Sequence, residues 1–377
     1  MKGRRIGSGT LIVLGLAACG TGGGEAARPA AEIDTLPNGA VRVRNPETGV
    51  WAEGEEWRLV EELRIGSAMG AGPDAFGDVI DIEVDPLGRI YVLDEQAQEI
   101  RVFDADGGYV RTLARRGAGP GEIENARGMA FDNAGSLWVQ DPGNGRYSVF
   151  DTTGSVLATN AWGFPGWSYT WDGVFDGQGR LIDRTFFPGN EEFRHGFLVI
   201  DPALVAVDTI PLPQYENETY RFDQAGGFSI RPVPFTPIQH SVVDPTGSIW
   251  VGVSDAYRIA RIGFDGDTTL VVEKAGAPLA VPDETRQEEI RGIEEQFPGA
   301  VFDRDRIPRT HPFFQRLAVD ESGRLWVEPA RTDSGPVVLD VFDPEGRYLG
   351  SVSSPVVPAP FRAWRFSEDR IHLVVHD

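Results

Sequence analysis

The sequence predicts an all-β fold. A short block containing a turn and an apolar strand recurs along the chain, glycine and proline are abundant at 46 and 27 residues, and only one segment has clear helical periodicity. The chain has 377 residues. Since all-β folds often exceed the usual length of a domain, a single domain can account for it. Its packed core must supply the stability, because Cys19 is the only cysteine and no internal disulfide can form.

The repeated block reads Asp, two residues, Gly, one residue, Ile or Leu, an aromatic residue and Val. Asp and Gly favour a tight turn, and the alternating apolar residues favour the strand that follows, so each block predicts a hairpin. Four clear copies, one weaker copy without the aromatic residue and one degenerate copy occur; they begin at Asp85, Asp132, Asp244 and Asp320, at Asp176, and at Asp369.

A second hairpin pattern follows the first, with an apolar strand, then Asp, two residues and usually Gly. Examples are residues 100–107, 147–154 and 341–346. Two hairpins make one four-stranded sheet, and six copies predict a six-bladed β-propeller. Blades three and six depart most from the pattern, so their registers are the least defined.

Two long gaps between copies predict insertions at about 211–237 and 276–313. The first should form an extra hairpin. The second should contain a short helix with Asp283 as its N-cap and an apolar stripe of Ile290, Ile293 and Phe297. We expect this helix to cover the propeller as a lid or side brace; a partner-binding helix is the alternative.

The sixth copy needs two further strands to complete its sheet. Residues 41–49 have the second-hairpin pattern, and Trp57 to Ile65 form another strand. Pairing both ends of the chain in one blade would close the ring and remove its open edges. The predicted propeller therefore covers residues 40–377.

The N-terminus has the features of an export signal. Basic residues at 2, 4 and 5 precede a mostly apolar stretch from Ile6 to Ala18, which is too short to span a bilayer as a helix. It ends in Leu16-Ala17-Ala18-Cys19-Gly20, which resembles the bacterial lipobox. This resemblance implies cleavage before Cys19 and acylation of its thiol, with two or three acyl chains giving stable anchoring at about 0.8 kcal/mol per buried CH₂.

These features predict a signal peptide at 1–18 and an acylated Cys19 followed by a flexible tether at 19–39. An ordinary cleaved signal is the alternative. We expect a bacterial cell-envelope location, lipid-anchored on the periplasmic or outer-membrane face. The formal charge of −22 would repel phosphate backbones, so nucleic acid is not an expected partner. We expect a monomer.

One segment resembles the inter-blade signature of NHL-type six-bladed propellers, particularly a branch of bacterial lipoproteins. It consists of residues 116–123 followed by Arg127-Gly128-Met129-Ala130-Phe131-Asp132. The resemblance covers about residues 40–377. It implies a fold that serves binding modules, lyases and lactonase-like enzymes alike.

The residue four places before each turn aspartate should lie near the propeller axis on the top face. We include Arg127, beside Gly128, for blade two, and Arg362 or Arg365 for blade six. This column can line a solvent-filled channel or bind a polar ligand. The candidates are Asp81, Arg127, Asp172, His240, Arg316 and Arg362.

Two sharper sites are possible. Asp81, Asp172 and His240 could meet at a calcium or zinc ion, although no cofactor is required by the sequence. The aromatic connection into blade three could form a ligand pocket with Trp167 and Trp171, or fill the space between blades.

No nucleophile, phosphate-binding or dinucleotide motif occurs in the sequence. The sequence therefore favours a binding or scaffolding module that engages a small molecule, a glycan or an envelope protein. A metal-assisted lactonase-like hydrolase or lyase with its site on the axis is the alternative.

Overall fold

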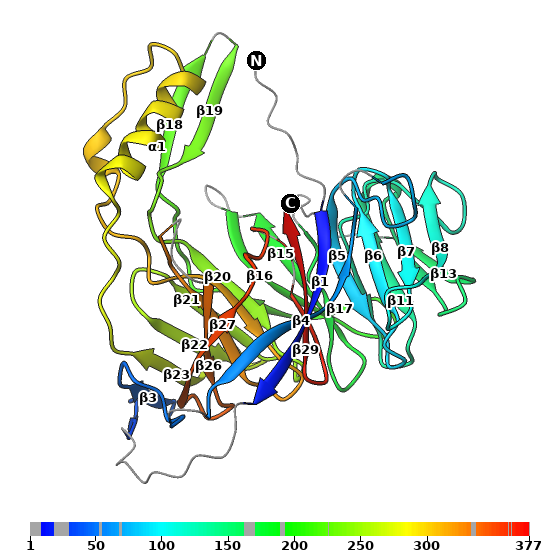
Figure 1. The fold of residues 1–377 in the computed structure, drawn as a ribbon, viewed down its shortest axis with the longest axis horizontal. Helices are drawn as coiled ribbons and strands as arrows, with labels where there is room; N and C mark the ends of the chain where they lie inside the picture. Colours follow the sequence, from blue (N-terminus) through cyan, green and yellow to red (C-terminus); the bar gives the residue numbers. More distant parts are fainter. Residues whose placement is uncertain are drawn as a thin grey trace.

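The computed structural model describes residues 9–18, 30–52, 55–67, 70–161, 170–188, 193–224, 226–332, 337–360, 362 and 364–376. It confirms the six-bladed β-propeller. Figure 1 shows the first two blades on one side, the fourth and fifth on the other, and strands from both ends of the chain between them. None of the described helices is long and apolar enough to cross a membrane.

The first three blades follow the chain in order. Blade one comprises β5 (Val79–Val84), β6 (Ile90–Asp94), β7 (Glu99–Phe103) and β8 (Tyr109–Arg116), with the short β9 (Glu122–Ile123) parallel to β8. Blade two comprises β10 (Gly128–Phe131), β11 (Leu137–Asp141), η1 (Pro142–Asn144), β12 (Arg146–Phe150) and β13 (Val156–Ala161). Blade three comprises β14 (Val174–Phe175), β15 (Leu181–Pro188), β16 (Phe193–Ile200) and β17 (Ala206–Pro211).

Blades four and six include strands from the N-terminal region, whereas blade five does not. Blade four comprises β20 (Gln239–Val243), β21 (Ile249–Val253), β22 (Arg258–Ile262) and β23 (Thr268–Lys274), extended by β3 (Val41–Asn45) and β2 (Glu32–Thr35). Blade five comprises β24 (Phe314–Val319), β25 (Leu325–Pro329), β26 (Val337–Phe342) and β27 (Tyr348–Ser354). Blade six comprises β28 (Arg365–Ser367), β29 (Arg370–His376), β1 (Gly9–Ala18) and β4 (Trp57–Ile65).

The turn aspartates explain why the repeat keeps its pattern. The carboxylate of Asp320 accepts hydrogen bonds from the backbone N–H groups of Ser322 and Arg324, from Arg324 Nε at 2.7 Å and from Trp326 Nε1 at 2.9 Å. Gly323 completes the turn at φ +79°, a conformation that favours glycine. One carboxylate therefore fixes the turn, the basic residue after it and the aromatic residue of the next strand.

The sequence pattern predicted that segment 41–49 would help to close the last blade, but the structure places it elsewhere. Its strand β3 lies parallel to β23 in blade four instead. The Asn45 side chain donates to the carbonyls of Glu273 and Gly346 and accepts from Tyr348 N–H, so it bridges blades four and five. Val43 is fully buried on one side of β3. A hairpin pattern identifies a strand but not the sheet edge that it joins.

Blade six is closed by both ends of the chain, with β4 outermost as predicted. The third strand, between β29 and β4, is β1, and it is antiparallel to both. It comes from the segment that has the composition of an export signal. Leu11, Ile12 and Leu14 are fully buried. Cleavage before Cys19, which remains a prediction and lies outside the described residues, would remove this strand.

The two insertions pack on each other. The first contains the predicted hairpin, β18 (Thr219–Gln224) and β19 (Gly227–Pro232), and the second contains the predicted helix α1 (Asp283–Gln296) and the turn η2 (Arg304–Arg306). We call these four elements the tower. Pro282, not Asp283, occupies the N-cap, and no side chain caps the helix; Asp283 instead pairs with Arg309.

The tower has its own apolar core. Tyr220 and Phe222 from β18 pack against Ile290, Ile293 and Phe297 from the helix region. The rings of Phe222 and Phe297 are stacked with their centroids 4.1 Å apart. The predicted apolar stripe of the helix is therefore correct, but it faces the other insertion. Figure 1 shows α1, β18 and β19 projecting from the blades at the opposite end of the view from β3.

Candidate functional site

The candidate site is the top face, which we define as the face that carries the connections between successive blades and the ends of the second strands. Both tower insertions leave from this face, one between blades three and four and the other between blades four and five. Asp81, His240 and Arg316 lie on inner strands, while Arg127, Asp172 and Arg362 lie in the segments leading into inner strands.

Asp81 joins three blades. One carboxylate oxygen lies 3.0 Å from Arg365 Nη2 in blade six and the other accepts the N–H of Met129 in blade two at 2.7 Å. Arg365 Nε also lies 2.6 Å from the Glu83 carboxylate. Burial raises the pKa of Asp81, and the positive charge of Arg365 opposes this rise. Arg365 is therefore the basic residue of blade six that pairs with Asp81.

Arg362, the other candidate from blade six, does not pair with Asp81. Its guanidinium lies 2.6 Å from Asp78 Oδ1, in the segment that leads into β5, and its carbonyl accepts from Arg316. Arg316 also donates to the carbonyl of Ala359 and lies 3.2 Å from Glu328 Oε2. These contacts connect blades five, six and one on the top face.

Arg127 and Asp172 are also paired with charged side chains. Arg127 forms an ion pair with Glu95, which belongs to blade one. Asp172 lies 3.3 Å from Arg184, whose guanidinium also donates to the carbonyl of Ser241 in blade four. Most of the predicted charged residues are therefore paired with side chains outside the predicted column; within it, Arg316 donates to the carbonyl of Arg362.

His240 differs from the other candidates. Its Nε2 atom is buried and has no hydrogen-bond partner within the described part of the chain. The imidazole ring lies 5.4 Å from the ring of Phe314. Burial, together with the charges of Arg316 and Arg184, lowers its pKa to about 4. The side chain is therefore neutral at pH 7.

The predicted metal triad is not assembled. Asp81 and Asp172 are engaged by different arginines, and no group of three or more His, Cys, Asp or Glu side chains among the described residues is placed to hold a metal ion. Spacing along the repeat places a residue near the axis, but it does not determine whether its carboxylate turns toward a neighbouring guanidinium.

Trp171 fills space between blades two and three. This is the second of the two roles that the sequence allowed, the first being to line a ligand pocket. It is almost fully buried and packs on Tyr147, with ring centroids 5.7 Å apart. Its Nε1 and the Tyr147 hydroxyl both donate to the buried Asp183 carboxylate, at 2.8 and 2.5 Å. Burial raises the pKa of Asp183 to about 6. Trp167 lies outside the described residues.

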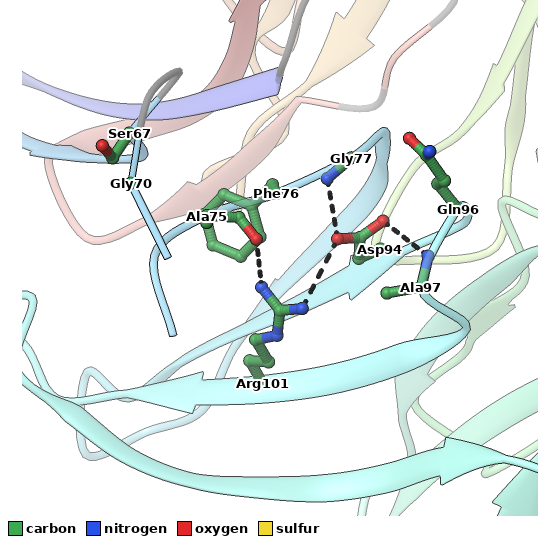
Figure 2. A pocket seen from close by; sticks show the side chains of 9 residues that line it. All are labelled: Ser67, Gly70, Ala75, Phe76, Gly77, Asp94, Gln96, Ala97 and Arg101. Carbon is green, nitrogen blue, oxygen red and sulfur yellow. Dashed lines mark hydrogen bonds and ion pairs between the residues drawn. The ribbon is translucent and has the colours of Figure 1, made fainter. Parts of the chain in front are cut away.

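A pocket of about 420 Å³ lies beside blade one, between the segment before β5 and the end of β6. Figure 2 shows Arg101 pointing toward Asp94 and the carbonyl of Ala75. Its guanidinium also lies 2.9 Å from Glu99 and 5.4 Å from the centroid of the Phe76 ring. Nothing in the repeat pattern marks this pocket, because one wall comes from the irregular segment before the first copy.

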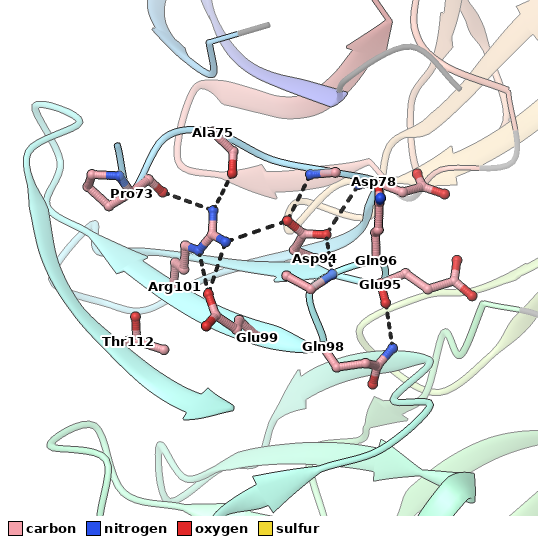
Figure 3. Close-up of polar contacts among 12 residues, drawn as sticks. Pro73, Ala75, Asp78, Asp94, Glu95, Gln96, Gln98, Glu99, Arg101 and Thr112 are labelled. Carbon is pink, nitrogen blue, oxygen red and sulfur yellow. Dashed lines mark hydrogen bonds and ion pairs between the residues drawn. The ribbon is translucent and has the colours of Figure 1, made fainter. Parts of the chain in front are cut away.

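Asp94 holds the walls of this pocket together. Its carboxylate accepts the backbone N–H groups of Gly77 and Ala97, as Figure 2 shows, and that of Asp78, as Figure 3 shows. Arg101 Nη2 lies 3.7 Å away. The polar groups of the pocket already bind each other. Its floor is therefore preformed, and these groups are not free to bind a ligand.

The outer face of the tower hairpin is apolar and accessible. Alternate residues of a strand share a face, and Phe228 and Ile230 of β19 are 53% and 60% exposed on the side opposite the tower core. Arg221 on β18 lies over the Phe228 ring at 3.7 Å. An aromatic and an aliphatic residue beside a guanidinium form the kind of surface that binds partners.

Comparisons with known proteins agree with the fold. A family described as 6-bladed beta-propeller matches residues 75–160. A search of the curated proteins found no match. Among solved structures, the chain is similar to a candidate exported protein of Bacteroides fragilis, with 15% identity, a TM-score of 0.44, and coverage of 74% of this chain and 72% of that one.

Two enzymes are also among the similar structures. Virginiamycin B lyase from Staphylococcus aureus is 12% identical, with a TM-score of 0.38 and coverage of 96% of this chain and 98% of that one. A gluconolactonase from Xanthomonas campestris is 13% identical, with a TM-score of 0.40 and coverage of 80% and 88%.

Proposed function

We propose that this chain is a lipid-anchored, extracytoplasmic propeller that binds a polypeptide partner of the cell envelope through its tower. One observation carries the proposal. Two insertions from successive blades build a separate apolar core on the top face and still leave Phe228 and Ile230 accessible on β19. Exposed apolar residues cost solubility, and their retention beside charged neighbours is typical of an interaction surface.

The end of β1 shows which face of the unprocessed chain the predicted anchor segment leaves from. Cys19 follows β1, and the last residues of β1 pair with the beginning of β4, where Ala18 lies opposite Trp57. The N–H of Leu16 donates to the carbonyl of Asp369, in the turn between the first two strands of blade six. Such turns lie on the face opposite the tower. In the unprocessed chain β1 therefore ends on the face opposite the tower. Once processing removes β1, the predicted tether of residues 19–39 would set how the tower is held relative to the membrane.

The contacts of the axial residues do not favour the hydrolase or lyase alternative. It required Asp81, Asp172 and His240 to act on one ion or substrate. Arg365 engages the buried carboxylate of Asp81, and Arg184 engages the partly exposed carboxylate of Asp172. Removal of Arg365 would leave a buried charge without a partner.

Site-specific photo-crosslinking in the bacterial envelope tests the proposal. A photoreactive phenylalanine analogue at position 228 should give a discrete adduct that Ile230→Asp abolishes. The matched control is position 301, because Val301 is 97% exposed in the segment after α1 and lies outside the β19 face. Equal adducts from both positions, or none from position 228, would contradict the proposed surface. Anchoring is tested separately, since Cys19→Ser should abolish palmitate labelling.

A further inference from the structure

Strand β1 has two incompatible roles. In the fold it is the third strand of blade six, paired with β29 from Gly9 to Gly15 and with β4 from Leu11 to Ala18. In the sequence it is the apolar part of the predicted export signal. If processing occurs before Cys19, the mature propeller loses this strand and keeps both of its neighbours.

The place that β1 occupies has a defined chemistry. Leu11 and Val13 pack into the cluster that contains residues of blade one, such as Val79 and Ile82. Ile12 and Leu14 pack on the opposite side, into the cluster that contains Trp326 of blade five. Both faces of the strand are therefore apolar, and its backbone is hydrogen-bonded along both edges.

The two strands that flank β1 have little strand pairing on their other sides. Strand β4 joins blade five by a single residue pair, Ser353 with Arg58. Strand β29 is paired on its other side with only three residues of β28. Loss of β1 would leave two facing strand edges with unpaired N–H and C=O groups and a buried apolar floor.

The described N-terminal strand β3 does not match this place. Its valines alternate with Arg42 and Arg44, so one of its faces is charged. Those arginines pair with Asp34 and Glu32 of β2 at the edge of blade four. Moving β3 between β29 and β4 would bury two guanidinium groups in one of the apolar clusters, which is strongly unfavourable.

We propose that processing turns the gap between β29 and β4 into an acceptor site for one extended, apolar β-strand of a partner polypeptide. The partner strand would replace β1 by strand addition, with main-chain hydrogen bonds to both edges and apolar side chains on both faces. A Cβ at Gly15 would lie 2.2 Å from Glu62 Oε1, so a partner residue larger than glycine at this place requires the half-exposed Glu62 side chain to turn aside. This inference rests on the proposed processing at Cys19.

The experiment starts from the complete chain and does not depend on natural processing. A Cys19→Ser chain carries a specific protease site inserted after residue 24, and it is cut only after folding. The probe is a fluorescent peptide of residues 9–18 with lysines added at both ends for solubility. Its matched control has Asp in place of Ile12 and Leu14.

The proposal expects the probe to exchange with the cut fragment and to raise the thermal midpoint of the cut protein. The control peptide should bind about 100-fold more weakly, because it would bury two carboxylates in an apolar cluster. A peptide of residues 40–46 should not compete.

Three outcomes would overturn the proposal. In the first, the fragment leaves, the thermal midpoint is unchanged and the probe does not bind, which means that β4 has moved onto β29. In the second, the cut protein unfolds and the probe does not rescue it. In the third, the peptide of residues 40–46 binds as tightly as the probe. Palmitate labelling lost in Cys19→Ser is a separate result, so failure of the anchor and failure of the acceptor site are distinguishable.

Discussion

Arg365 and Asp81 form an ion pair of 3.0 Å between the inner strands of blades six and one. The pair lies at the closure of the ring, where the first and last complete repeats meet. Glu83 accepts a second hydrogen bond from the same guanidinium at 2.6 Å. One guanidinium thus lies between two carboxylates. Burial would lower the pKa of Arg365, but the charges of these carboxylates raise it.

Arg365→Met should lower the free energy of unfolding by about 3–5 kcal/mol, because it leaves Asp81 and Glu83 as buried charges without a cation. The matched control is Arg370→Met, whose exposed pair with Glu62 should contribute less than about 1 kcal/mol. Urea unfolding measures both. Because the penalty comes from a buried charge without a partner, adding Asp81→Asn to Arg365→Met should restore part of the lost stability. If the double variant were less stable still, lost packing would be the cause.

Buried histidines should make stability depend on pH. The pKa of His372 is lowered to about 4 by burial and by the charge of Arg370. As the pH falls, His372 is therefore protonated at a higher pH in the unfolded chain than in the folded chain. The stability that His372 contributes is complete above about pH 6.5 and is lost as the pH falls toward 4, with a loss of about 2–3 kcal/mol at the lower limit.

The variant His372→Gln isolates this contribution. The difference between the free energies of unfolding at pH 7 and pH 4.5 should shrink by about 2 kcal/mol relative to the original chain. His376, which is exposed at the end of the same strand, provides the control His376→Gln. An equal change in both variants would mean that His372 does not titrate as a buried group.

Sequence patterns predicted the parts of this fold that depend on local chemistry. Asp320, Gly323 and Trp326 fix one hairpin by contacts within seven residues, so the number of blades could be counted from such blocks. The same local logic located the hairpin and the helix of the tower. Its core required contacts between Phe222 and Phe297, which are far apart in the chain.

Contacts between distant segments were not predictable in the same way. The apolar segment containing Leu11 and Leu14 fits an export signal and a blade strand equally well, because both need only continuous apolar character. Likewise, the repeat placed Asp81 near the axis, but the partner Arg365 comes from the degenerate sixth copy. Side-chain pairing across blades depends on register and rotamer, which spacing alone does not define.

The turn aspartates should contribute different amounts to the free energy of unfolding, according to the groups that donate hydrogen bonds to them. Asp320 accepts from an arginine and a tryptophan in addition to the backbone, whereas Asp244 accepts only from backbone N–H groups and the Thr246 hydroxyl. Asp320→Ala should therefore cost about 3 kcal/mol of unfolding free energy, and Asp244→Ala at least about 1 kcal/mol less. Chemical denaturation of both variants checks this order. Equal losses would mean that the backbone turn alone sets the cost.

The tower should unfold independently of the propeller, because its core of Phe222, Ile293 and Phe297 forms a cluster separate from those of the blades. Phe222→Ala removes a stacked ring and should expose the amides of α1 to hydrogen exchange, while the thermal midpoint of the blades changes by only a few degrees. Phe103→Ala is the control, since Phe103 is buried within blade one and its loss should lower the midpoint of the whole propeller. If Phe222→Ala lowered the global midpoint as much as Phe103→Ala, tower and blades would be one cooperative unit. Independent unfolding would instead allow the face of Phe228 and Ile230 to change its position without disturbing the ring of ion pairs around Arg365.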